Sequence, residues 1–122
     1  MMKKKIKIAP ATKTGAHHWI TQRISAVALI PLIIWLAISS VKIAQDPTGY
    51  MPVFFAYPFN AVMGILLIST SLYHGSLGIQ VVIEDYVANK FLRQIMIMVI
   101  HFVSIATAVS AILAIARLHL VA

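Results

Sequence analysis

The spacing of charged residues along the chain predicts three helices long enough to cross a membrane. Eighteen uncharged residues run from Ile24 to Val41, and 23 run from Gln94 to Ala116. The uncharged stretch between them begins with several prolines, so we expect its helix to start at Phe59 and to reach Ile83. At 1.5 Å per residue the three segments span, in chain order, roughly 27, 37 and 34 Å, against about 30 Å of bilayer hydrocarbon.

The fold class that follows is an all-α membrane protein. No segment alternates with period two, which argues against strands, and Pro31 in the first segment is tolerated as a kink within a membrane. Sixteen residues separate Lys7 from Ile24, so we expect the first segment to be retained rather than cleaved as a signal peptide. A single domain, residues 1–122, then has a basic segment (1–18) and transmembrane helices at about 19–42, 59–84 and 91–117.

Composition and charge narrow the class further. The chain is 61% apolar and 11% charged, whereas soluble domains average about 45–50% and about 25%. A water-soluble globule and a disordered basic tail are both excluded. The net charge of +7 is spread along an apolar chain, so no nucleic-acid partner is expected, and the lack of cysteine excludes disulfides and thiolate metal sites.

The distribution of Lys and Arg predicts the orientation. Three crossings that start in the cytoplasm leave eight of the 10 basic residues inside and two, Lys42 and Arg117, outside. The positive-inside rule therefore places the N-terminus and the second loop in the cytoplasm and the C-terminus outside.

His74 is the candidate cofactor ligand within the membrane. It lies about ten residues before the cytoplasmic end of its helix, or roughly 15 Å deep, and titratable groups at such depth mark function by default. Gly75 and Gly78 remove bulk beside it, which suits a flat porphyrin whose iron the imidazole binds. Alternatively, His74 forms an interhelical hydrogen bond and the glycines serve helix packing.

Asp85 and Tyr86 form a candidate quinone site at the cytoplasmic end of the same helix. Eleven residues after His74, Asp85 returns to nearly the same helix face. A phenol donates a hydrogen bond to a quinone carbonyl, and a nearby carboxylate organises proton delivery. Alternatively, Tyr86 belongs to an interfacial aromatic belt, and Glu84 and Asp85 end the helix in water.

Three other polar groups border or enter the membrane. Arg23, with His17 and His18 one to two turns earlier, stands at the start of the first helix, where a guanidinium could bind haem propionates or lipid head groups. His101 is level with His74 in the third helix. It is either a second axial ligand of a self-contained b-type cytochrome or a buried, hydrogen-bonded histidine.

The segment from His74 to Val87 resembles the signature of the small hydrophobic membrane-anchor subunit (D-type) of succinate dehydrogenase. The stretch from Gly15 to Arg23 resembles the start of that family's first helix. The resemblance covers all three helices in order and length, and it is specific over about a quarter of the chain. The matching positions in the signature are His74, Gly78, Gln80, Val81, Asp85, Tyr86 and Val87.

This resemblance implies a role for each of five residues. His74 would be an axial ligand of the haem b iron, with the second axial histidine coming from the partner anchor subunit. Arg23, and less specifically His17, would contact haem propionates. Tyr86 would hydrogen-bond ubiquinone and Asp85 would support that site, whereas His18 and His101 have no assigned role and no residue is catalytic for succinate.

The resemblance also implies partners and a location. The chain would be a non-flavin subunit of succinate dehydrogenase, assembled with a C-type cytochrome b anchor, an iron–sulfur subunit and a flavoprotein that oxidises succinate. A bacterial inner membrane is expected, because no Arg-rich, Ser-rich transit peptide precedes the helices. The alternatives are a fumarate reductase anchor, the self-contained cytochrome that uses His74 and His101, and a scaffold without cofactors.

Overall fold

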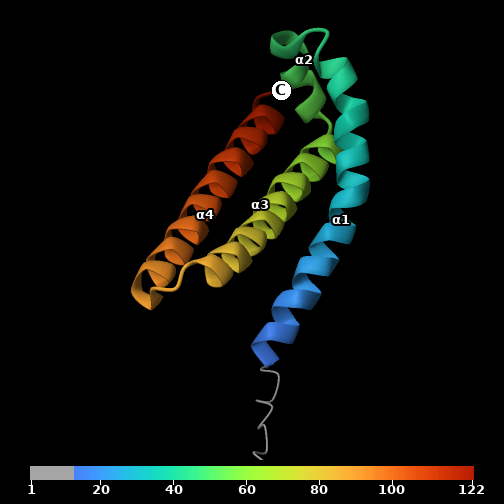
Figure 1. Ribbon diagram of the computed structural model, residues 1–122. Coiled ribbons are helices and arrows are strands. Elements are labelled where there is room, and N and C mark those ends of the chain that lie inside the picture. Colours follow the sequence, from blue (N-terminus) through green and yellow to red (C-terminus); the bar gives the residue numbers. More distant parts are fainter. Residues whose placement is uncertain (1–12) are drawn as a thin grey trace, which may run out of the picture.

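A computed structural model of the chain describes residues 13–122, with side chains from residue 15. It is all-helical over these residues, with α1 (Lys13–Ile43), α2 (Pro47–Ala56), α3 (Pro58–Tyr86) and α4 (Lys90–Val121) (Figure 1). The helices α1, α3 and α4 are long and apolar enough to cross a membrane, so the predicted fold class is confirmed. The lysines that dominate the predicted basic segment, Lys3, Lys4, Lys5 and Lys7, lie outside the described residues.

The first long helix begins earlier than the spacing of charges suggested. It starts at Lys13 rather than near residue 19, so His17 and His18 lie on the helix itself. It also continues unbroken through Pro31. Arg23 therefore sits well inside a continuous helix, and its position relative to His17 and His18 is fixed by helical geometry.

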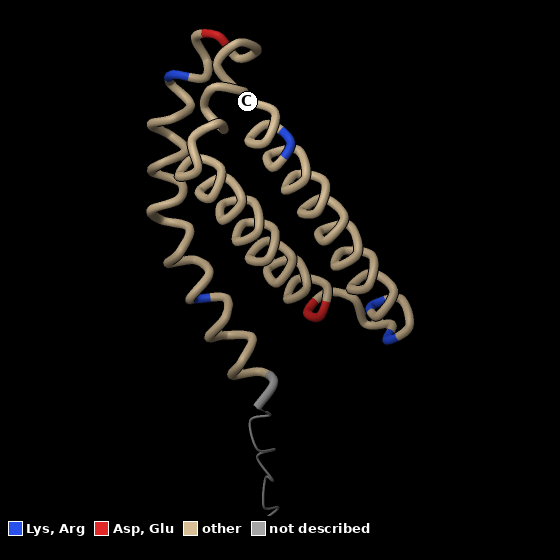
Figure 2. Tube along the Cα trace, turned by 180° about the vertical axis from the view of Figure 1, so that it is seen from behind, with Lys and Arg blue, Asp and Glu red and all other residues tan. Residues whose placement is uncertain are grey.

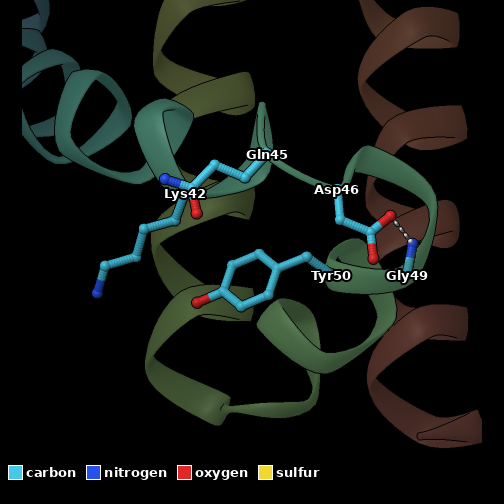
Figure 3. Close-up of a pocket in the computed structure, with 5 residues that line it drawn as sticks. All are labelled: Lys42, Gln45, Asp46, Gly49 and Tyr50. Carbon is cyan, nitrogen blue, oxygen red and sulfur yellow. Dashed lines mark hydrogen bonds between the residues drawn. The ribbon is translucent and has the colours of Figure 1, made fainter.

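The short helix α2 was not predicted. Its carboxylate cap is Asp46, whose Oδ1 accepts a hydrogen bond from the Gly49 N–H at 3.1 Å. Figure 3 shows this bond in a shallow pocket that Lys42, Gln45 and Tyr50 also line. Because the Asp46 carboxylate is engaged as a helix cap, we assign this pocket a structural role.

The third helix is the centre of the bundle. It packs against α1 on one side and α4 on the other, and α2 folds over the end where α1 stops and the chain terminates (Figure 1). Phe54 of α2 is buried and stacks near Trp35 of α1, with ring centroids 5.8 Å apart. A Cβ built on Gly64 of α3 would lie 2.9 Å from Phe55 Cε1 and 3.2 Å from Ile115 Cδ1, so glycine allows α2 and α4 to approach α3.

Charged residues gather near the two ends of the bundle, and the long stretches between them carry few (Figure 2). The start of α1 and the α3–α4 turn lie at one end, and the α1–α2 loop and the C-terminus lie at the other (Figure 1). Many large apolar side chains face outward between these ends, among them Ile24, Val27 and Ile30, each at least 60% exposed. Lipid or a partner helix is the medium in which such a surface is stable.

Candidate functional site

His74 is held at the crossing of α3 with α1. Its side chain is half-buried, and its Nδ1 lies 2.9 Å from the Oγ of Ser25 on α1. The Ser25 hydroxyl also donates to the backbone carbonyl of Gln22 at 3.0 Å. His74 therefore makes the interhelical hydrogen bond that the sequence left as an alternative to metal binding, and it makes that bond through one ring nitrogen.

His74 and Arg23 line the same groove between α1 and α3. This groove has a volume of about 410 Å³, and its other lining residues are Trp19, Gln22, Ala26 and Val81. The Arg23 side chain is exposed, and its guanidinium carbon lies 5.3 Å from the centroid of the Trp19 ring. The structure thus brings together an imidazole and a guanidinium that the sequence singled out on different helices.

Of the two glycines near His74, Gly75 borders space that this chain does not fill, and Gly78 lies against Gln22. A Cβ on Gly75 would meet nothing within 4 Å, and a Cβ on Gly78 would meet the Gln22 Nε2 at an ordinary 3.6 Å. The Gln22 Oε1 is buried and has no hydrogen-bond partner among the described residues. An open groove with one imidazole, one guanidinium and spare space fits a flat ligand that carries acidic groups, such as haem.

The two histidines at the start of α1 lie outside this groove. His17 is exposed and His18 is half-buried, and their ring centroids are 6.4 Å apart. Neither ring lines the groove that contains His74 and Arg23. Within this chain the geometry supports Arg23 as a contact for an acidic group and gives His17 no matching support.

The candidate quinone residues lie at an ordered corner of the bundle. The Arg93 Nε–H donates to the Val87 carbonyl at 3.0 Å, and Asn89 Oδ1 accepts from the N–H groups of Phe91 and Leu92. These bonds fix the turn that follows Asp85 and Tyr86. Both side chains are exposed, and Tyr86 is 84% exposed. A phenol donor and a carboxylate are available here, but the walls of a pocket must come from other molecules.

His101 lines a different groove, between α3 and α4. Its Nε2 lies 3.0 Å from Gln80 Oε1, and Gln80 Nε2 donates to Glu84 Oε1 at 2.8 Å. Because an amide oxygen only accepts, His101 donates through Nε2. His101 is half-buried and hydrogen-bonded within the bundle, which favours that interpretation over an iron shared with His74.

Several polar partners in these sites carried no signal in the sequence. Ser25 is a single hydroxyl on an apolar helix, and its pairing with His74 depends on how α1 is rotated against α3. The same holds for Gln80 with His101, and for His119, whose Nδ1 lies 3.0 Å from the Phe55 carbonyl. Such cross-helix pairs depend on packing angles that a linear pattern does not contain.

Fold and site together define an all-α, three-span membrane subunit with an imidazole facing a groove between two helices. Residues 4–117 match the family described as succinate dehydrogenase/fumarate reductase transmembrane subunit, and the chain belongs to this family. The resemblance seen between His74 and Val87 is thereby confirmed.

Named relatives agree with this assignment. The succinate dehydrogenase hydrophobic membrane anchor subunit of Rickettsia typhi is 36% identical over 91% of this chain and 89% of its own length. That of Rickettsia bellii is 35% identical over the same shares. The succinate dehydrogenase membrane anchor subunit of Reclinomonas americana is 32% identical over 77% of this chain and 81% of its own. No solved structure matches the chain.

Proposed function

We propose that this chain is the membrane anchor of a succinate:ubiquinone oxidoreductase (respiratory complex II) in a bacterial inner membrane. It would dock the flavoprotein, which oxidises succinate, and the iron–sulfur subunit onto the bilayer. The named relatives support succinate dehydrogenase over fumarate reductase, because each is named for the former. The outward-facing apolar surface supports assembly with a C-type anchor subunit and lipid.

Haem b is the cofactor we propose for the groove between α1 and α3. The observation that carries this proposal is that His74 and Arg23 line that one groove. His74 would bind the haem iron through Nε2, the partner anchor would supply another histidine ligand, and Arg23 would hold a propionate. When bound, the haem supplies a one-electron carrier. His17 enters only as a second propionate contact implied by the family resemblance.

The quinone site is proposed at the cytoplasmic end of α3. The Tyr86 hydroxyl would donate to a quinone carbonyl, and Asp85 would organise the protons taken up there. Because Tyr86 is 84% exposed, this chain contributes one edge of the site. The iron–sulfur subunit and the partner anchor would complete the pocket.

A pair of histidine variants tests the haem assignment in the assembled complex. Replacing His74 with Ala should abolish or visibly alter the low-spin b-type absorption spectrum, because the iron loses an axial ligand. His101→Ala is the matched control, since His101 is also half-buried and hydrogen-bonded but lines another groove. A complex that needs His101 and not His74 for its spectrum would refute the assignment.

A further inference from the structure

We infer that Ser25 is a positioning residue for His74, and that it fixes which ring nitrogen carries the proton and how the ring is oriented. This inference rests on the proposed haem site. Ser25 is 6% exposed and lies on α1, so the contact joins two different helices. Nothing in the sequence or the family resemblance assigns it a role.

The two contacts of the Ser25 hydroxyl determine the direction of each hydrogen bond. A serine hydroxyl has one proton to donate. The backbone carbonyl oxygen of Gln22, 3.0 Å away, can only accept a hydrogen bond, so the hydroxyl proton is donated to it. The bond to His74 at 2.9 Å then requires a proton on Nδ1, donated to the Ser25 oxygen. His74 is thereby left with an unprotonated Nε2, whose lone pair is the one a metal binds.

Burial makes this hydrogen bond difficult to replace. Ser25 is 6% exposed and bonds to His74 across the two helices, so few other acceptors on the α1 side can reach Nδ1. The bond also ties the imidazole plane to the α1 backbone through the Gln22 carbonyl. Outer hydrogen bonds of this kind set the tautomer, the ring orientation and the basicity of a metal-bound histidine.

Loss of the hydroxyl should therefore change the bound haem more than the fold. A less basic imidazole stabilises the ferric iron less, so the midpoint potential should become more positive. A tenfold change in the relative stability of the two oxidation states corresponds to about 59 mV for one electron. A ring with a freer orientation should also broaden and shift the low-field EPR signal of the ferric haem, and haem should be lost about tenfold more readily from solubilised complex.

The test compares four variants in the complex purified from membranes. Ser25→Ala and Ser25→Val remove the hydroxyl, whereas Ser25→Thr keeps it and has nearly the shape of the valine. The added methyl has space, because Ser25 borders a second groove of about 520 Å³. Ser76→Ala is the matched control: Ser76 is 5% exposed and donates to the Tyr73 carbonyl at 2.9 Å, in the same three-residue pattern, but has no histidine partner.

We expect Ser25→Ala and Ser25→Val to raise the haem potential and shift the EPR signal, while Ser25→Thr and Ser76→Ala resemble the wild type. Equal behaviour of the threonine and valine variants would overturn the proposal, as would a Ser25→Ala complex with wild-type potential and EPR signal. His74→Ala, measured in parallel, separates failure of the haem assignment from failure of the role of Ser25. If His74→Ala leaves the haem spectrum intact, the haem assignment itself fails. If only His74→Ala changes the haem, the assignment stands and the role of Ser25 fails.

Discussion

Tyr86 offers the smallest change that separates quinone reduction from the rest of the enzyme. Tyr86→Phe removes one hydroxyl from an exposed side chain, so assembly should survive. A hydrogen bond to a neutral ligand contributes roughly 0.5–1.5 kcal/mol, and up to about 3 kcal/mol if charge develops on the quinone oxygen. At about 1.4 kcal/mol per tenfold, quinone reductase activity should fall between severalfold and a hundredfold.

The control for this prediction is succinate oxidation with a soluble dye that takes electrons upstream of the quinone. That activity should stay near normal, because in the proposed complex the flavin belongs to another subunit. Tyr57→Phe is the matched variant, since Tyr57 is 64% exposed and precedes the opposite end of α3. Asp85→Asn should lower quinone reduction in the same direction as Tyr86→Phe. A parallel loss of both activities would instead assign these residues to docking.

The sequence predicts single functional side chains better than their partners. The spacing of residues along the chain predicts that His74 lies deep in its span and that Arg23 lies at the start of the first one. The structure places these two side chains on one groove. Ser25 and Gln80 could not be predicted, because their pairing depends on the rotation of neighbouring helices. His17 does not line this groove, so its role as a propionate contact stays a prediction from the family resemblance.

Among the helices, α2 is the one that the sequence pattern did not predict. The prolines that begin the second uncharged stretch predict a helix only from Phe59, yet Pro47 and Pro58 stand at the first turns of α2 and α3. Proline is favoured there because its missing N–H would have no partner in any case. Pro52 lies inside α2 and forgoes one backbone bond. The apolar contacts of Phe54 with its aromatic neighbours offset that loss.

The cap of α2 gives a prediction for this element. Asp46→Ala removes the side chain that accepts from the Gly49 N–H, and the loss of such a cap costs about 0.5–2 kcal/mol. We expect a lower melting temperature of the purified complex, followed by circular dichroism. Gln45→Ala, next to it and exposed, should melt like the wild type; an equal drop in both would show that the loop and not the cap is responsible.

Packing of α2 and α4 on α3 gives a second prediction at this scale. A methyl group at Gly64 would press on Phe55 and Ile115, and overpacking of this kind costs about 1–3 kcal/mol. Gly64→Ala should therefore lower the melting temperature of the complex. Ser71→Ala is the control on the same helix, because Ser71 is exposed and its hydroxyl donates to the Ile68 carbonyl within that helix. Unchanged melting of Gly64→Ala would mean that α2 can shift to accommodate it.

The whole molecule is a thin bundle that depends on its surroundings. Among the described residues, the buried apolar ones are Leu32, Phe54, Ala61, Leu77, Ile83 and Ile115. The start of α1 diverges from α3 (Figures 1 and 2), and the groove with His74 and Arg23 is lined by residues of these two helices. Span number could be predicted from sequence because length and hydropathy are local properties. The arrangement of the spans could not, because lipid-facing and helix-facing residues are equally apolar.

Orientation in the membrane is the last prediction, and it decides on which side the quinone residues lie. The α3–α4 turn and the start of α1 share one end of the bundle (Figure 1). Eight of the 10 Lys and Arg residues belong to that side by the predicted topology, so the positive-inside rule assigns it to the cytoplasm. A reporter that is active only outside the cytoplasm should be active when fused at Ala122 and inactive when fused after Asn89. The opposite pattern would place Asp85 and Tyr86 away from the cytoplasmic subunits and remove the physical basis of the quinone site.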